Sequence, residues 1–367
     1  YDDVISAMRD VAPILEHDPS AVEVMDDVML DLARNTGEFA DLVATLPEGT
    51  DSTLLVEFYA DSMDEARRKI ADLLADRLPG YEAAVEPSES HLETSADTHA
   101  IDALEAYDPD RQAKFWKMRK SGLPILLSRT GDDKHWPFVE DTAVPPEHLP
   151  EYVADLQDLF DSHDTFAAYY AHAGPGVLHI RPLLNLKAAD GIETMEAISE
   201  AVTDRVIEYG GSVSGEHGDG RARTKYNRKL YGEDLWQTFR ELKTAFDPDW
   251  LLNPGNVCGD HDPSRGLRYD ASYEFDAEFD PVLNWDNDNG FQGMVELCHG
   301  CAGCTGHQDT TGGVMCPTYR AADEEITSTR GRANMLRQAM SGDLPADVFD
   351  EEFVSEVMDL CIGCKGC

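Results

Sequence analysis

The chain has 367 residues, enough for about two or three domains. It carries 72 acidic against 30 basic side chains, and a net charge of −42 argues against nucleic acid as a general partner. Since the acids are spread along the whole sequence, we interpret them as the solvated coat of a protein from a halophilic source. No apolar run approaches the roughly 18–20 residues of a membrane span, so no membrane span is expected.

The first 260 residues alternate helix-like and strand-like patterns. Capping-box spacing at Ser20 and at Ser62 predicts helices over residues 20–34 and from 62 to about 78. Strands are predicted over residues 53–59, 138–144, 165–172 and 177–184, and further helices over 146–160, 192–208 and 233–246. This interleaving predicts an α+β fold, with an antiparallel sheet covered by helices on one side.

Three zones divide the chain. Residues 1–260 are predicted to form one domain. Residues 261–293 are rich in Asp, Asn, Gly and Pro without periodicity, which is typical of a linker. Residues 294–367 are predicted to form a small, mainly helical segment that holds nearly all of the cysteines.

The cysteine spacing indicates iron–sulfur chemistry. Two Cys-x-x-Cys-x-x-Cys triplets and one Cys-Pro pair are typical of 4Fe-4S ligation, with structural zinc and disulfides as the alternatives. Two such clusters need one thiolate more than this segment holds, and we interpret the distant Cys258 as a non-ligand. Together with a first residue that is Tyr1 and not Met, this shortfall leads us to expect a piece of a longer protein. The expected ligands are Cys298, Cys301, Cys304, Cys316, Cys361, Cys364 and Cys367.

A second constellation lies in the first zone. His172 and His179 are seven positions apart, and the Gly-Pro-Gly insert at residues 174–176 breaks the strand so that both imidazoles could turn toward one point. With Glu216 as a third ligand, they would form the set of two imidazoles and one carboxylate that catalytic divalent metals use. Two core histidines and a surface turn remain the alternative interpretation.

Several motifs follow one another in a fixed order. They are Ala-Val-Glu-Val-Met-Asp at 21–26, Phe-Trp-Lys-Met-Arg-Lys at 115–120, the segment 138–145, Gly-Glu-His-Gly at 215–218, the segment 246–255, and the segments 314–319 and 328–334. Because it has these motifs in this order, the chain resembles the FAD-linked oxidases with the vanillyl-alcohol-oxidase type of flavin fold. More narrowly it resembles the D-lactate dehydrogenase and glycolate oxidase group, in which the flavoprotein is fused to a 4Fe-4S ferredoxin-type part.

The resemblance implies roles for individual residues. His172, His179 and Glu216 would hold a divalent Zn, Mn or Fe, and His217 would be the general base beside the flavin. Arg119 would bind the substrate carboxylate, and Glu216, His217 and Asn253 would lie next to the FAD. The family's Gly-Asp-Gly-Asn is Gly-Pro-Gly-Val at 174–177 here, which makes relatives of the hydroxyglutarate type a poorer guide.

The resemblance also implies a function for the whole protein. We expect part of an oxidoreductase that oxidises a small 2-hydroxy acid such as D-lactate or glycolate, with hydride passing to FAD and electrons leaving through 4Fe-4S clusters to a quinone or electron carrier. The N-terminal domain that holds most of the FAD is missing from these residues, so the fragment is expected to be inactive alone. A cytoplasmic location is expected, with peripheral attachment at the inner face of the membrane and a homodimer as options. An electron-transfer or zinc-binding scaffold module without catalytic activity is the alternative.

Overall fold

The computed structural model describes residues 1–88, 97–275, 281–306, 315–341 and 351–364. Its contacts divide the chain into two compact units. Unit 1 comprises Tyr1–Leu126, His135–Leu184 and Asp190–Arg268, and unit 2 comprises Leu127–Lys134, Asn185–Ala189 and Tyr269–Cys367. The domain boundaries predicted at residues 260 and 293 stay predictions.

The fold is α+β, built around an antiparallel sheet. Strand order is β2-β1-β5-β6-β3, and the short β4 pairs with β6. The central hairpin joins β5 to β6, and β1 pairs with β5 and with the edge strand β2. The strands are β1 (Ala21–Met25), β2 (Thr53–Glu57), β3 (Lys134–His135), β4 (Thr142–Ala143), β5 (Ala167–His172) and β6 (Val177–Leu184).

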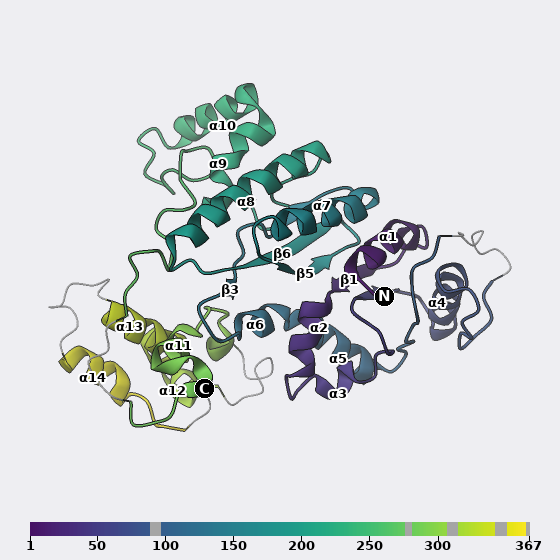
Figure 1. Cartoon of the computed structure of the whole chain (residues 1–367), viewed down its shortest axis with the longest axis horizontal. Helices are drawn as coiled ribbons and strands as arrows, with labels where there is room; N and C mark the ends of the chain where they lie inside the picture. The colour runs from purple at the N-terminus through teal and green to yellow at the C-terminus, as the bar shows by residue number, and fades with distance from the viewer. Residues whose placement is uncertain (89–96, 276–280, 307–314, 342–350, 365–367) are drawn as a thin grey trace. The chain divides into compact units, whose positions relative to one another are not determined.

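One face of the sheet is covered by three long helices (Figure 1). These are α1 (Val4–Leu15), α7 (Leu149–Asp161) and α8 (Ala189–Glu208). They bury the side chains of alternate strand residues, among them Val22, Val24, Leu178 and Ile180. Burial of apolar side chains on this face is the main force that holds the helices on the sheet.

The opposite face also carries helices, but only over part of its area. Met25, Ala168 and Tyr170 pack there against a second apolar cluster. It is contributed by α2 (Asp27–Arg34), α3 (Ala40–Val43), α5 (Pro109–Lys120) and α6 (Gly122–Leu127). Helices therefore lie on both faces, whereas the sequence analysis placed them on one.

The helix predicted over residues 20–34 is wrong in its first third. Residues 21–25 form β1, where Val22 and Val24 enter the main core, and the helix begins only after Asp26. Asp26 is the N-cap, since its Oδ1 accepts the backbone N–H of Met29 at 2.9 Å. The hydroxyl of Ser20 instead accepts the N–H of Tyr59 at 2.8 Å, so the Ser-x-x-Glu spacing is fortuitous here.

The second predicted helix agrees with α4 (Met63–Arg77), where Ser62 accepts the N–H of Glu65 at 3.2 Å. The strand predicted over residues 138–144 is reduced to β4, because Asp141 takes a φ of +71° that interrupts extended backbone. Unit 1 is completed by η1 (Pro146–His148), α9 (Gly220–Tyr231) and α10 (Glu233–Phe246).

Unit 2 is mainly helical. Within it the ammonium of Lys187 forms ion pairs with Asp132 at 2.7 Å and Glu296 at 2.6 Å. Among the described helices, none combines the length and the apolar character needed to cross a bilayer. The elements are η2 (Asp286–Asp288), α11 (Gly290–Glu296), η3 (Gly303–Thr305), α12 (Pro317–Ala322), η4 (Glu325–Thr327), α13 (Thr329–Ser341) and α14 (Glu351–Asp359).

Candidate functional site

The β5–β6 hairpin brings His172 and His179 onto one face of the sheet. His172 lies opposite Val177, and His179 lies opposite Tyr170, which puts the two imidazoles on adjacent strands with ring centroids 5.2 Å apart. The turn between them depends on Gly176, which has a φ of +75°. A Cβ there would lie 2.0 Å from the carbonyl oxygen of Val144, so only glycine fits.

A glycine-flanked loop brings Glu216 and His217 to the same face. The buried carboxylate of Asp141 holds this loop, because its two oxygens accept the backbone N–H groups of Glu216 and His217, each at 2.9 Å. The hydroxyl of Ser214 donates to the same carboxylate at 2.7 Å. Burial by itself would raise the pKa of Asp141, but these three donors bring the pKa below its ordinary value. The loop is therefore fixed by an ionised side chain from the neighbouring segment.

Glu216 is the centre of the resulting cluster. Its Oε1 lies 3.4 Å from the Nε2 of His172, 3.4 Å from the Nε2 of His179 and 3.5 Å from the Nε2 of His217. One atom from each of His172, His179 and Glu216 can be chosen so that all lie within 4.8 Å of one another. The structure thus brings together the three residues that the sequence analysis proposed as metal ligands.

The chemistry of this donor set fits a divalent cation. Burial, reinforced by the positive charge of neighbouring residues, lowers the pKa of His179 to about 3, so this imidazole is neutral and retains a lone pair. Its Nδ1 is buried and has no hydrogen-bond partner among the residues that the structure describes. His172 donates from Nδ1 to Glu23 at 2.8 Å, which leaves its Nε2 lone pair facing Glu216. Two imidazole nitrogens and one carboxylate are a common ligand set for Zn, Mn and Fe.

His217 stands beside this set in a position suited to proton transfer. Its ring stacks on that of His179, with centroids 5.3 Å apart and planes 7° from parallel. Its Nδ1 lies 3.3 Å from the carboxylate of Glu140, which is in turn paired with the buried Arg181. Glu140 therefore orients the imidazole, and Nε2 faces the cluster.

Arg119 lies in the last turn of α5 and is buried, with 6% of its surface exposed. Its guanidinium pairs with Glu23 at 2.8 Å and lies over the ring of Tyr170, 5.2 Å from the centroid. Its Nε has no hydrogen-bond partner among the described residues. A buried cation with an unused donor beside the cluster is suited to bind a carboxylate.

Asn253, the remaining candidate of the first zone, lies away from these contacts. It occupies a turn after α10 with a φ of +45°, its side chain is exposed, and its carbonyl accepts the N–H of Asn256 at 3.2 Å. In the described structure no contact joins its side chain to the histidine cluster, so its role beside a flavin stays a prediction.

The described cysteines are all free thiols. The Sγ of Cys304 accepts the backbone N–H of Arg330 at 3.4 Å, and the buried Cys316 lies 3.4 Å from a guanidinium nitrogen of Arg332. Cys301, Cys361 and Cys364 are exposed, Cys298 is half-buried, and Cys367 lies outside the described residues. In the part of the chain that the structure describes, the groups that could hold a metal contain no cysteine, so cluster ligation also stays a prediction.

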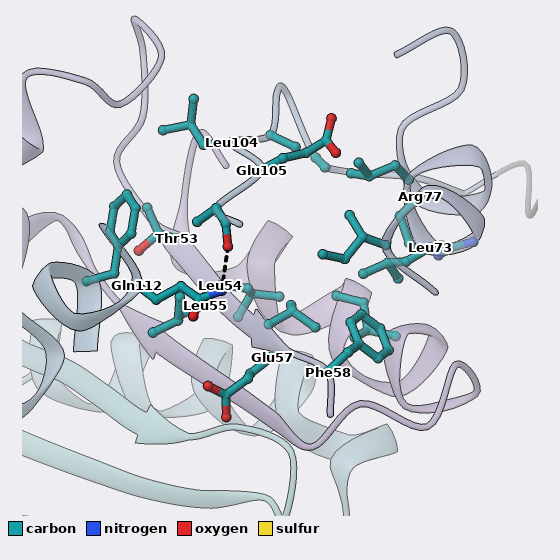
Figure 2. Close-up of a pocket in the computed structure, with 18 of the residues that line it drawn as sticks. Thr53, Leu54, Leu55, Glu57, Phe58, Leu73, Arg77, Leu104, Glu105 and Gln112 are labelled. Carbon is teal, nitrogen blue, oxygen red and sulfur yellow. Dashed lines mark hydrogen bonds between the residues drawn. The ribbon is translucent and has the colours of Figure 1, made fainter. Parts of the chain in front are cut away.

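A cavity of about 550 Å³ lies elsewhere in unit 1, between β2, α4 and α5 (Figure 2). Leu54, Phe58 and Leu73 line it, and Gln112 donates to the carbonyl of Ala106 at 2.7 Å on its wall. It contains none of the histidines of the cluster. This cavity and the polar cluster on the sheet are therefore separate features of unit 1.

Sequence reasoning missed Glu23, Asp141, Glu140 and Arg181, all of which orient the cluster. Each is a charged residue inside a predicted helix or strand. Glu23 interrupts the apolar residues of β1, and Arg181 interrupts those of β6. A charged residue on the inner face of a sheet needs a buried partner, and this signal could have identified both.

Comparison with known proteins points to one family. The description "FAD linked oxidases, C-terminal domain" matches residues 1–257. The D-2-hydroxyglutarate dehydrogenase of Pseudomonas putida is 28% identical over 100% of this chain and 38% of its own length. That of Pantoea ananatis is 32% identical over 92% of this chain and 32% of its own length. The glycolate oxidase subunit GlcD of Escherichia coli is 32% identical over 42% of this chain and 30% of its own length. The chain thus spans about a third of the length of these relatives.

Proposed function

The chain belongs to the FAD-linked oxidases, whose C-terminal domain it contains, and on this premise we propose that it forms the substrate side of an active site that oxidises a 2-hydroxy acid. The observation that carries the proposal is the convergence of His172, His179 and His217 on one oxygen of Glu216. The buried Arg119 beside this cluster adds the cation that a hydroxy-acid substrate requires.

His172, His179 and Glu216 would hold the divalent metal, Zn, Mn or Fe. When bound, such an ion polarises a substrate hydroxyl and lowers its pKa. Arg119 binds the substrate carboxylate through its unused donor and so sets the orientation of the hydroxyl. Since Arg119 and the cluster are joined through Glu23, the carboxylate and the hydroxyl are bound by one connected set of side chains.

His217 takes the hydroxyl proton at Nε2. Its Nδ1 faces the carboxylate of Glu140, which favours the tautomer with a proton on Nδ1 and a lone pair on Nε2. The carboxylate then stabilises the imidazolium that forms. When bound, the FAD that the family implies would accept the α-hydrogen and its two electrons.

The cysteine-rich segment would carry those electrons away through 4Fe-4S clusters. Supporting this, the sulfur atoms of Cys304 and Cys316 have hydrogen-bond donors from Arg330 and Arg332, and hydrogen bonds to sulfur are one of the means by which proteins set cluster potentials. The similarity to the two D-2-hydroxyglutarate dehydrogenases extends over at least 92% of the chain, whereas that to the GlcD of Escherichia coli covers 42%. D-2-hydroxyglutarate therefore joins D-lactate and glycolate as a substrate to be tested.

The experiment is anaerobic reduction of the flavin in the full-length protein by each of these three acids. We expect one of them to bleach the flavin absorbance in the wild type, and His172→Ala and Glu216→Ala to abolish bleaching. His163→Ala, which changes a histidine that bonds to Leu159 and belongs to none of the described metal-binding groups, is the control and should bleach normally. Normal bleaching in both cluster variants would contradict the proposal.

A further inference from the structure

We propose that Glu23 is a positioning residue that binds both His172 and Arg119. It thereby keeps a constant distance between His172, the metal ligand, and Arg119, the cation that binds the substrate carboxylate. The inference rests on the proposed function. It concerns a residue that touches neither the substrate nor the metal, and its test can fail separately.

The position of Glu23 follows from the register of the sheet. Glu23 of β1 lies directly opposite His172 of β5, and directly opposed residues of an antiparallel pair project from the same face. Its Oε1 accepts a hydrogen bond from the Nδ1 of His172 at 2.8 Å, and its Oε2 lies 2.8 Å from an Nη of Arg119. One carboxylate therefore serves two functional side chains, with one oxygen for each.

The first consequence is the tautomer of His172. A carboxylate only accepts hydrogen bonds, so the proton of the neutral imidazole must lie on Nδ1. The lone pair then lies on Nε2, which is the atom 3.4 Å from Glu216. An imidazole without this partner could carry its proton on Nε2 and present an N–H where a lone pair is needed.

The second consequence is the burial of Arg119. Its side chain is 7% exposed and that of Glu23 is 8% exposed, so each charge is removed from water. A buried cation without a counter-ion is strongly unfavourable, and Glu23 supplies the counter-ion. The ion pair is formed at one Nη, and neither that Nη nor Nε has a hydrogen-bond partner among the described residues, so the guanidinium keeps donors available to a substrate carboxylate.

Glu23 is not itself placed to ligate a metal. The described groups that could hold an ion contain His172, His179, Glu216 and their neighbours, but not Glu23. Its effect therefore passes through His172, which is how residues behind a metal ligand act.

Glu23→Gln is the sharpest test, because it keeps the shape of the side chain but has only one acceptor oxygen. The amide can serve His172 or Arg119, not both, and its NH₂ group must then face a donor. Glu57→Gln is the matched control. Glu57 lies on the adjacent strand, accepts a hydrogen bond from Trp116 Nε1 at 2.9 Å, and is outside the cluster.

The first measurement requires no metal. In full-length protein isotope-labelled at its histidine nitrogens, NMR shifts report the tautomer of His172, whose signals are assigned by their loss in His172→Gln. The hydrogen bond to Glu23 raises the pKa of His172, so the spectra are recorded at alkaline pH, where the imidazole is neutral. We expect the Nδ1–H form alone in the wild type and in Glu57→Gln, and a mixture of tautomers in Glu23→Gln. An unchanged tautomer in Glu23→Gln would overturn the proposal.

The second measurement is the binding of Co²⁺, followed by its visible absorption, together with KM and kcat for the hydroxy acid. Loss of a side chain that orients a ligand typically weakens metal binding by about 10- to 100-fold, and we expect this in Glu23→Gln together with a raised KM. Glu23→Asp, which keeps the charge, should recover part of the affinity. Undiminished Co²⁺ affinity in Glu23→Gln would overturn the proposal.

The two results also separate this inference from its premise. If the wild type bound no Co²⁺ but the tautomer of His172 still depended on Glu23, the metal role of the cluster would be wrong and the positioning role of Glu23 would be supported.

Discussion

The carboxylate of Asp141 accepts the backbone N–H of Glu216 at 2.9 Å, although 75 residues separate them in the sequence. Asp141 is fully buried and takes a φ of +71°. The burial and the positive φ of Asp141 are explained by its role in holding the loop that carries Glu216, the central residue of the cluster.

Asp141→Asn should therefore loosen the loop. Asparagine tolerates a positive φ, so the backbone is retained, but its NH₂ group must face one of three donors. We expect a loss of about 1–3 kcal/mol in the free energy of unfolding, measured in urea, and slower flavin reduction. The control is Asp164→Asn, an exposed aspartate with a φ of +52° that anchors no loop. Equal effects at the two positions would show that Asp141 has no special role.

Gly176→Ala should disturb the turn that aligns His172 with His179. A methyl group there meets the carbonyl oxygen of Val144 at 2.0 Å, and the φ of +75° adds about 1–2 kcal/mol of strain. We expect the variant to lose more stability than this strain energy alone accounts for, and to bind metal more weakly. Gly210→Ala is the control: Gly210 has a similar φ of +69° but open space around it. This variant should therefore lose only the stability that corresponds to the backbone strain. Thermal unfolding of both variants measures the difference, and equal losses would contradict the steric argument.

The sequence predicted the α+β fold class, and the structure brings His172, His179 and Glu216 together as the sequence analysis expected, while their role as metal ligands stays a prediction. The Gly-Pro-Gly break at 174–176 indicated a turn between His172 and His179, and the β5–β6 hairpin has that turn. The helix predicted at Ser20 failed because capping-box spacing does not distinguish a helix start from a strand whose buried residues alternate.

The orienting residues could not be predicted in the same way, because their partners are distant in sequence. Glu23 is 149 residues from His172, and only the pairing of β1 with β5 puts them opposite each other. Helices on the second face were also missed, since Met25 and Tyr170 give no signal of what covers them. Register and packing across the sheet decide these contacts, and neither is encoded in local spacing.

Asp26 should make the stability of unit 1 depend on pH. Complete burial raises its pKa to about 8, although the N–H groups of Met29 and Tyr169 oppose the rise. A carboxyl whose pKa is higher in the folded state than its ordinary value of about 3.9 stabilises the fold most below that value. This contribution is lost as the pH rises through about 8.

The free energy of unfolding should accordingly fall between about pH 4 and pH 8 in the wild type and change less in Asp26→Asn, which has no proton to lose. Urea titrations at several pH values provide the measurement. The same slope in both proteins would show that Asp26 is ionised throughout this range.

Iron content decides between the proposed electron path and a zinc scaffold. We expect the full-length protein, purified without oxygen, to contain iron and acid-labile sulfide, and Cys298→Ser and Cys304→Ser to lose part of both, because serine is a poor ligand for such clusters. Cys258→Ser is the matched control, since this buried thiol lies outside both triplets and should leave the iron content unchanged. A colourless protein with tightly bound zinc that Cys304→Ser releases would instead support the scaffold, because thiolates in tetrahedral sites also bind zinc.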